Sequence, residues 1–256
     1  MNALILAAGF GTRLLPLTRV VPKCLMPIFG VPLIHYWICD LLDAGVHKIL
    51  INTHYKSDLV ANFINEQFYK DSITLVYEKE LLGTAGTMIE NKDFFNGSDF
   101  LVVHGDNYTD INLKELIHFH QEFRPDIHFT LTTFFSPNPS QCGIVTKYNN
   151  ILTSFTEKPL FPKSNLANCA IYSFGSHFFN TLGAEKVCND ISIDLIPNYT
   201  GDIKCFHHLG FNLDIGTHQS FFEAQSKTYK KTCPKCQLSS LSDKYTHLTE
   251  LIDNEF

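Results

Sequence analysis

The sequence lacks two features that would place the protein in a membrane or on a nucleic acid. No run of 18 consecutive apolar residues occurs, which excludes a helix of bilayer-spanning length. Lys and Arg number 20 against 26 Asp and Glu, so the formal net charge is −6 and a nucleic acid backbone is not expected as the main partner. Internal repeats and low-complexity tracts are absent too. We therefore expect neither membrane nor nucleic acid among the partners.

An export signal is also lacking. The apolar run Ala3–Ala8 has no basic segment before it and a Gly-rich turn directly after it, which is typical of a buried strand. The eight cysteines are scattered through apolar stretches, so we expect most of them to be reduced and buried. The predicted location is the cytoplasm.

The chain is long enough for one large core and a small appendage. With 256 residues, of which 45% are hydrophobic, we expect a main domain over residues 1–230 and a polar C-terminal appendage over 231–256. The appendage contains the CxxC pair Cys233 and Cys236. Three interpretations of this pair stay open: half of a zinc site completed by Cys205, His207 and His208, a redox pair, or an unremarkable tail.

Short branched apolar runs alternate with longer helical patterns in the first half of the chain. The pattern predicts strands over 3–7, 48–52, 73–77 and 100–104, and helices over 32–44, 57–68 and 112–123. Such alternation implies right-handed crossovers and a mostly parallel sheet whose ligands bind at the carboxyl ends of the strands. The second half indicates further mixed or antiparallel strands over 127–135, 143–148, 151–155, 168–174 and 204–208, a short helix over 192–198 and a last helix over 219–230. The predicted fold class is α/β.

The stretch LAAGFGTRLLPLTRVVPKCL after the first strand contains neither of the common nucleotide-binding glycine patterns. Leu14 stands where a GxGxxG motif needs its third glycine, and the P-loop pattern GxxxxGK[ST] is missing as well. Gly9 and Gly11 still allow backbone N–H groups to approach an anion, and Arg13 and Lys23 follow on a segment that Pro16 and Pro22 stiffen. Two cations on one stiff loop predict a phosphate ligand.

This stretch resembles the signature of the sugar-1-phosphate nucleotidyltransferases, which join a nucleoside triphosphate and a sugar 1-phosphate and release pyrophosphate. The resemblance implies a Rossmann-like, three-layer α/β sandwich with a mostly parallel mixed sheet, as in the glycosyltransferase-A-like nucleotidyltransferases. It covers residues 3–225 in family order. It also implies nucleotide contacts by the loop and by two later segments, through the residues Ala8, Gly9, Gly11, Thr12, Glu78, Gly83 and Thr84.

Five further segments resemble the family's remaining motifs, and one of them, SNLANCAIYSF at 164–174, places Asn168 against the sugar. LLGTAGTM at 81–88 resembles its base-recognition segment, and HGDNYTD at 104–110 places Asp106 as the first metal-binding carboxylate. FTEKP at 155–159 resembles the sugar-phosphate motif, and FNLDIGTHQSFFEAQ at 211–225 places Asp214 as the second metal ligand. The sugar phosphate is then expected to contact Asn107, Gly143, Glu157, Lys158 and Asn168.

The chemistry requires fixed positive charge. At neutral pH a nucleoside triphosphate carries about four negative charges and a sugar phosphate about two. Like charges about 4 Å apart repel by roughly 4 kcal/mol at an effective dielectric constant near 20, so cations must be in place before the two substrates meet. We expect Arg13, Lys23 and Asp106 to be catalytic, and Mg²⁺ to be held by Asp106 and Asp214.

Three functions from different classes follow from these features. The favoured one is an active nucleotidyltransferase; a non-catalytic nucleotide-binding paralogue is disfavoured because the charged residues are all in place. A dinucleotide-dependent oxidoreductase is disfavoured by the missing third glycine and by Asn52-Thr53-His54, where an acidic residue would end the second strand. GTP and mannose 1-phosphate, or a related hexose or heptose phosphate, are the preferred substrates, with UTP, dTTP and CTP as alternatives. A monomer or small homo-oligomer that makes polysaccharide precursors is expected.

Overall fold

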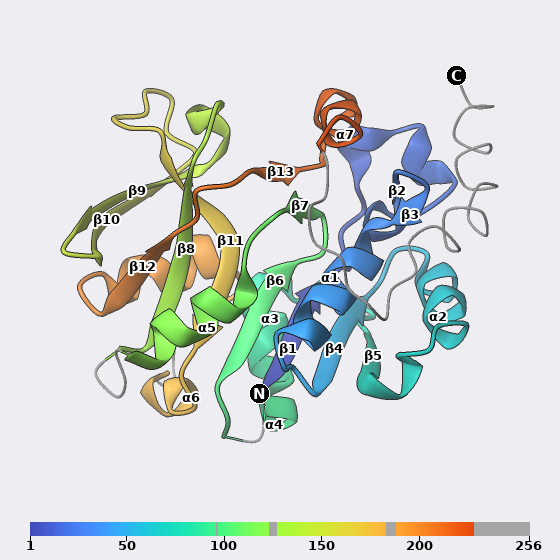
Figure 1. Cartoon of the computed structure of the whole chain (residues 1–256), viewed down its shortest axis with the longest axis horizontal. Helices are drawn as coiled ribbons and strands as arrows, with labels where there is room; N and C mark the ends of the chain where they lie inside the picture. Colours follow the sequence, from blue (N-terminus) through green and yellow to red (C-terminus); the bar gives the residue numbers. More distant parts are fainter. Residues whose placement is uncertain (96, 123–126, 183–187, 228–256) are drawn as a thin grey trace. The chain divides into compact units, whose positions relative to one another are not determined.

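The computed structural model describes residues 1–95, 97–122, 127–182 and 188–227, and these form two compact units (Figure 1). The first unit contains Met1–Leu4, Leu82–Val103 and Ile111–Asn212; the second contains Ile5–Leu81, His104–Asp110 and the described part of Leu213–Phe256. The boundary between the units falls inside two strands, β1 (Asn2–Leu6) and β6 (Phe100–His104). The appendage predicted over 231–256 lies outside the described residues.

The second unit has the parallel strand pair that the sequence predicts. Strands β4 (Lys48–Thr53) and β5 (Ile73–Tyr77) pair in parallel, with Ile49 opposite Ile73 and Thr53 opposite Tyr77. Helix α2 (Ser57–Asn65) connects them and lies beside β5 (Figure 1). Helix α1 (Leu33–Asp43) precedes β4 and is buried along almost its whole length, as its nearly continuous apolar sequence requires.

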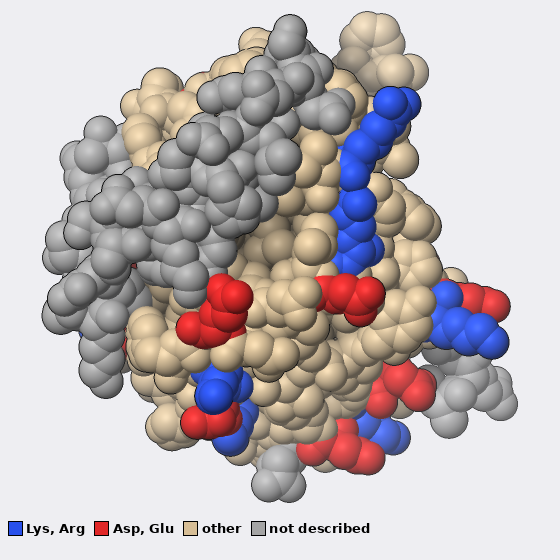
Figure 2. All heavy atoms as spheres, turned by 90° about the vertical axis from the view of Figure 1, so that its right-hand side faces the viewer, with Lys and Arg blue, Asp and Glu red and all other residues tan. Residues whose placement is uncertain are grey.

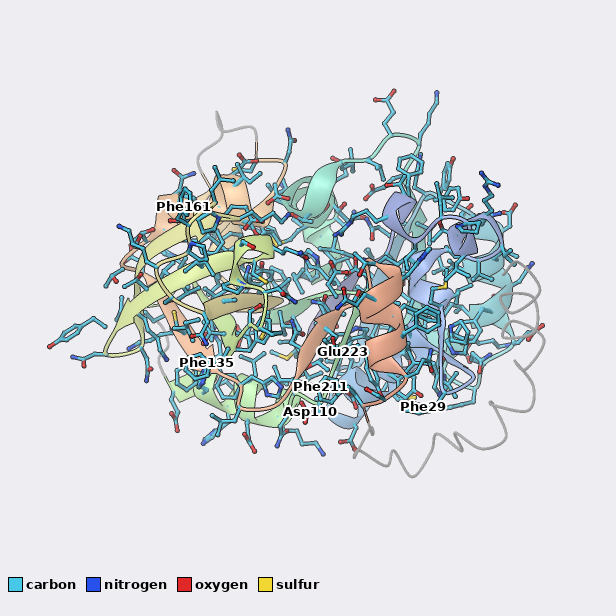
Figure 3. The ribbon with its side chains drawn as sticks, turned by 90° about the horizontal axis from the view of Figure 1, so that it is seen from above. Phe29, Asp110, Phe135, Phe161, Phe211 and Glu223 are labelled. Atoms are coloured by element: carbon cyan, nitrogen blue, oxygen red, sulfur yellow. The ribbon has the colours of Figure 1, made fainter. Side chains whose placement is uncertain are left out.

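Short elements complete the second unit. A small hairpin of β2 (Pro27–Ile28) and β3 (Val31–Pro32) precedes α1, and β7 (Asn107–Thr109), β13 (Asn212–Asp214) and α7 (His218–Ala224) come from later in the chain. Gln225, one residue after α7, accepts from the Phe29 N–H and donates to the Pro27 carbonyl, both at 2.8 Å. Phe29 and Glu223 mark the hairpin and α7 in Figure 3. These two bonds fix the end of α7 on the β2–β3 hairpin.

The first unit is built on longer, mainly antiparallel strands. Its strands β8 (Phe129–Phe135), β9 (Gly143–Tyr148), β10 (Ile151–Glu157), β11 (Leu166–Phe174) and β12 (Ile203–His207) follow the order β6-β11-β8-β12-β10-β9. Only the β8–β12 pair among these neighbours is parallel. The parallel pairing expected in the first half of the chain is found for β4 and β5. The mixed and antiparallel strands expected in the second half are found in β8 to β12, where a connection as short as Asn149-Asn150 permits only antiparallel pairing of β9 and β10.

Helices and aromatic rings cover the sheet of the first unit. Helix α5 (Leu113–Glu122) contacts β8, β11 and β12 (Figure 1), and α3 (Gly83–Glu90), α4 (Lys92–Phe95) and α6 (Phe178–Thr181) are shorter. Phe100 stacks on Phe174 with ring centres 5.0 Å apart, and Phe129 stacks on Phe174 at 4.8 Å. The high phenylalanine content, 22 residues in the chain, thus supplies part of this core.

The surface carries charge of both signs. On the face drawn in Figure 2, acidic and basic side chains lie next to one another in several small groups, and most of the described surface is uncharged. Within the described residues no helix is long and apolar enough to cross a membrane.

Candidate active site

The glycine loop after β1 adopts a tight turn that requires glycine. Gly11 has φ 65°, in the left-handed region, and a Cβ there would lie 2.8 Å from Cγ2 of Thr18. The Thr18 hydroxyl donates a 3.0 Å hydrogen bond to the Gly11 carbonyl, which fixes the turn. Gly9 and Thr12 are exposed, whereas Ala8 is buried. The exposed backbone of this loop is therefore accessible to an anion.

Lys23 is the centre of the charged cluster. Pro22 is extended, and Lys23 opens a short 3-10 helix, Lys23–Leu25, so its side chain leaves the chain at a fixed point. The ammonium lies 2.6 Å from Oδ2 of Asp106 and 2.5 Å from Oδ1 of Asp214, although Lys23 is only 8% exposed. Burial alone would lower the pKa of Lys23, but the two carboxylates outweigh burial and raise it above the ordinary value.

Asp106 is positioned by a close approach between two chain segments. Gly105 donates to the Leu6 carbonyl at 2.9 Å, and a Cβ at Gly105 would lie 2.9 Å from Cγ2 of Ile5. Only glycine permits this approach, which places Asp106 beside the end of β1. Burial would raise the pKa of Asp106, yet Lys23, followed by His104, holds it below its ordinary value. Asp106 is therefore ionised at neutral pH.

Asp214 and Arg13 complete the cluster. The Ile215 N–H donates to the Asp106 carbonyl at 3.1 Å, which brings the end of β13 to the same place. Nη2 of Arg13 lies 3.4 Å from Oδ2 of Asp214, and a Cβ at Gly216 would meet Arg13 Nη2 at 2.7 Å. The structure thus brings together all four charged residues that the sequence places at the phosphate and metal sites. Two positive and two negative side chains balance one another in the absence of ligands.

The residues predicted to bind metal fit a magnesium ion. Mg²⁺ is usually held by one or two protein carboxylates together with waters and substrate phosphates, rather than by an all-protein cage. Asp106 and Asp214 supply two carboxylates within reach of one cation, as their common contact with Lys23 shows. The described residues contain no group of three or more His, Cys, Asp or Glu that could hold a metal alone. The donor set therefore suits an ion that arrives with phosphate ligands.

A polar relay connects the glycine loop with Glu78. The Ala7 N–H donates to Oδ1 of Asn52 at 2.7 Å, and Nδ2 of Asn52 donates to Oε1 of Glu78 at 2.9 Å. Glu78 is only 4% exposed, and its carbonyl lies 2.8 Å from Nδ1 of His54. Phe10 contacts His54 edge-on with ring centres 5.1 Å apart. A buried carboxylate and aromatic rings thus lie next to the loop.

Asn52 is a site residue that the sequence analysis did not identify. It was considered only as the absence of an acidic residue at the end of the second strand. The sequence indicates only that Asn52 is a polar side chain at the carboxyl end of a parallel strand. It does not indicate a site role, because the two hydrogen-bond partners of Asn52 are 45 and 26 residues away in the chain. Gly216 has the same kind of distant contact, with Arg13, and the sequence does not indicate it either.

In the first unit, the β9–β10 hairpin brings together Gly143, Glu157 and Lys158. Gly143 pairs with Glu157, and a Cβ at Gly143 would lie 2.7 Å from Oε2 of Glu157. Lys158 has φ 43°, and its ammonium lies 3.3 Å from Oε1 of Glu157. The Lys158 side chain is exposed. The predicted sugar-phosphate residues of this hairpin therefore form one cluster.

Asn168 lies on the neighbouring strand β11 at an irregularity in its pairing. The register of β11 against β8 shifts between Asn168 and Tyr172, and Ala170 has φ 56°. Oδ1 of Asn168 accepts from the Ala170 N–H at 2.9 Å, and its Nδ2 donates to the Tyr172 hydroxyl at 2.8 Å. These bonds fix the orientation of the Asn168 amide.

The remaining predicted residues have structural contacts of their own. Gly83 has φ 78°, and a Cβ there would lie 2.3 Å from the Asn189 carbonyl oxygen. The Thr84 hydroxyl accepts from the Ile191 N–H at 2.8 Å. Asn107, in the second unit, is buried, and its carbonyl accepts from Nε1 of Trp37 at 2.7 Å. Nucleotide or sugar binding by these three residues stays a prediction.

Most of the described cysteines are reduced and buried, as expected. Cys24, Cys142, Cys169, Cys188 and Cys205 form no disulfide, and all of these except Cys142 are buried, whereas Cys39 is disulfide-bonded. Burial raises the pKa of Cys24 and of Cys205 to about 12, so these thiols are unreactive. The CxxC pair at 233 and 236 lies outside the described residues, and its three interpretations stay open.

Comparison with known proteins identifies the family. The model of a family described as nucleotidyl transferase matches residues 2–231. The chain belongs to this family. UTP–glucose-1-phosphate uridylyltransferase AglF of Haloferax volcanii is 29% identical over 239 residues, which cover 91% of this chain and 98% of AglF. The catalytic subunit beta of mannose-1-phosphate guanylyltransferase of Xenopus tropicalis is 29% identical over 227 residues, 86% of this chain and 62% of that protein.

A solved structure has the same fold as this chain. HddC from Yersinia pseudotuberculosis matches this chain with a TM-score of 0.74 at 23% identity, covering 88% of this chain and 98% of HddC. The predicted recognition of a nucleotidyltransferase is confirmed by the family match, and the α/β class by the fold.

Proposed function

We propose that the protein transfers a nucleoside monophosphate from a nucleoside triphosphate to a sugar 1-phosphate and releases pyrophosphate. The observation that carries the proposal is the charged cluster in which Lys23 contacts both Asp106 and Asp214 beside Arg13. Such a cluster, next to an exposed glycine loop, suits a polyphosphate and its counter-ion. The β9–β10 residues Glu157 and Lys158, with Asn168, are proposed to bind the sugar phosphate.

The reaction needs no general base from the protein. A phosphate oxygen of the sugar phosphate, already ionised at neutral pH, forms the new bond to the α-phosphorus, and the bond from that phosphorus to the bridging oxygen breaks. The electron pair leaves on pyrophosphate. Arg13 and Lys23 stabilise the negative charge that develops there. Mg²⁺ held by Asp106 and Asp214 would neutralise phosphate charge and orient the triphosphate when bound.

Glu78 supports GTP as the preferred nucleotide. A carboxylate offers two hydrogen-bond acceptors and no donor when ionised. Among the bases, guanine presents two adjacent donors, N1–H and the N2 amino group, which match two acceptors. Uracil and thymine present one N–H between two carbonyl oxygens, which a carboxylate would repel. The relay from Ala7 through Asn52 holds Glu78 near the loop proposed for the phosphates, and UTP, dTTP and CTP are the alternatives.

The test is pyrophosphate release with Mg²⁺, each of four triphosphates and several sugar 1-phosphates. We expect the largest turnover with GTP and mannose 1-phosphate or a related hexose or heptose phosphate. Arg13→Ala should lower kcat by roughly 10²–10³-fold, as for loss of an electrostatic transition-state donor. Arg19→Ala, an exposed arginine of the same unit, is the control and should leave kcat unchanged. Normal turnover of Arg13→Ala at saturating substrate would contradict the role of Arg13.

The absence of turnover with every pair would instead favour a non-catalytic nucleotide-binding paralogue. The three-layer, glycosyltransferase-A-like arrangement, the cytoplasmic location, the monomeric or small homo-oligomeric state and the supply of polysaccharide precursors stay part of this proposal. A domain over 1–230 with an appendage over 231–256 is likewise proposed.

A further inference from the structure

Lys23 makes its ion pairs with the two side chains that are proposed to bind the metal. Its ammonium donates to Oδ2 of Asp106 at 2.6 Å and to Oδ1 of Asp214 at 2.5 Å. Both distances are at the short end for charge-assisted hydrogen bonds. One buried cation therefore holds two carboxylates from segments that are 108 residues apart, as 214 − 106 gives.

A divalent ion and the ammonium cannot share this position. Mg²⁺ binds carboxylate oxygens at about 2.0–2.1 Å, so it would occupy the space between the same two oxygens that Lys23 now contacts. The repulsion between a divalent ion and an ammonium at such separations is strong, even at an effective dielectric constant near 20. The metal can reach Asp106 and Asp214 only if the ammonium moves away.

The structure also shows where the ammonium can move. A Cβ placed on Gly11 would lie 3.3 Å from Cβ of Lys23, so the lysine stem starts beside the glycine loop. Rotation of the flexible four-carbon side chain would carry the ammonium from the carboxylates towards that loop. A phosphate group at the loop would provide the ammonium with a new anionic partner.

We propose that Lys23 fills the metal position while no nucleotide is bound, and that the divalent ion enters only together with the triphosphate, whose phosphates attract the ammonium. The inference rests on the proposed function for the identity of the phosphate ligand. It specifies that the protein binds the metal–triphosphate complex and has little affinity for the free metal. Lys23 thereby keeps the two carboxylates together and neutralised between catalytic cycles.

The test is binding of Mn²⁺ without nucleotide, measured from the electron paramagnetic resonance signal of the free ion. Mn²⁺ prefers the same oxygen ligands as Mg²⁺. Lys23→Met removes the charge and keeps the stem, so it should bind Mn²⁺ at least about tenfold more tightly than the wild type. Lys48→Met, which removes an exposed charge from the same unit, is the matched control and should bind like the wild type.

The double variant Lys23→Met/Asp106→Asn tests whether the ion binds at Asp106. It should not show the tighter Mn²⁺ binding expected of Lys23→Met, because it lacks one of the two proposed carboxylate ligands. Equal Mn²⁺ affinities of the wild type and Lys23→Met would overturn the proposal. If Lys23→Met is unstable without metal, Mn²⁺ should restore its folding, measured by circular dichroism; a variant that stays unfolded with Mn²⁺ would also overturn it. No turnover is needed for these measurements, so a wild type that releases no pyrophosphate would refute the proposed function alone.

Discussion

At the scale of single residues, Ala170 is the clearest case of backbone strain. Its φ of 56° lies in the left-handed region, which costs a residue with a Cβ about 1–2 kcal/mol relative to the usual conformations. Asn168 holds it there through the 2.9 Å bond from the Ala170 N–H. The strain therefore supports the orientation of a proposed sugar-binding side chain.

Ala170→Gly should raise the free energy of unfolding by about 0.5–1 kcal/mol, because glycine adopts this conformation without the Cβ clash. Urea unfolding measures the difference. Ala167→Gly, at a regularly paired position of the same strand, should lower stability instead, since glycine weakens a strand interior. If both variants change stability in the same direction, the assignment of strain at Ala170 fails.

In the charged cluster, Lys23 and Asp106 follow local patterns in the sequence, whereas Asp214 is implied only by the resemblance to the family. Lys23 comes after a proline and Asp106 after a buried strand, and both patterns are visible within ten residues. The partners of these side chains could not be predicted in this way. Asn52 and Gly216 contribute through contacts with distant parts of the chain, so one sequence contains no local signal for them.

At the scale of elements, the β9–β10 hairpin depends on Gly143. A Cβ at this position would lie 2.3 Å from Cζ of Phe155 and 2.7 Å from Oε2 of Glu157, both on the opposite strand. Gly143→Ala should therefore displace Glu157, lower the free energy of unfolding by about 1–3 kcal/mol and raise KM for the sugar 1-phosphate more than it lowers kcat.

Steady-state kinetics and chemical denaturation check this prediction. Thr146→Ala, an exposed position of the same hairpin, is the control and should change neither KM nor stability appreciably. A Gly143→Ala protein with wild-type KM would show that Glu157 does not bind the sugar phosphate.

The long elements could be predicted from sequence, and the short ones could not. Strands β5, β6 and β9 have the predicted bounds, because branched apolar runs determine them. The strands β7 and β13 have three residues each and depend on partners elsewhere, so no periodicity indicates them. For α7, Thr217 caps the N-terminus through the Ser220 N–H, and Ser220 reciprocates.

At the scale of the whole molecule, two buried histidines predict sensitivity to acid. His35 in the second unit and His120 in the first are fully buried, and burial lowers the pKa of each to about 4. Nδ1 of His35 lies 2.8 Å from the Tyr69 hydroxyl, and that of His120 lies 2.8 Å from the Thr130 hydroxyl. Both rings stay neutral in the folded protein.

Because the unfolded chain takes up these protons near pH 6.5, stability should fall as the pH falls from about 6.5 towards about 4. Each histidine should contribute a loss of about 2 kcal/mol between pH 7.5 and pH 5.0. Asp106 has a lowered pKa, so the stability that its ionised form contributes is lost only at more acidic pH. Lys23 has a raised pKa, so its contribution to stability changes only at alkaline pH. Urea midpoints at the two pH values measure the loss.

Between pH 7.5 and pH 5.0, His35→Gln should lose about 2 kcal/mol less of its free energy of unfolding than the wild type, because it lacks one titrating ring. This difference does not depend on how the substitution changes stability at pH 7.5. The exposed His47 offers the control, since His47→Gln should leave the pH dependence as it is. A His35→Gln protein with the full wild-type pH dependence would contradict the assignment.

The division into two units was beyond the reach of the sequence analysis. The second unit is assembled from three separate segments, and nothing in the composition changes at Leu81, His104 or Leu213. A single predicted domain was the natural expectation, because the alternation of strands and helices continues across these points.

The discontinuous second unit also bears on synthesis of the protein. A growing polypeptide that has left the ribosome as far as residue 210 contains the glycine loop, Lys23 and Asp106, but it does not yet contain Asp214. Its lysine then has one acidic neighbour in place of two, and the unit has not received its final segment. Competence for the proposed phosphate chemistry therefore arises only after the segment that contains Asp214 has been made.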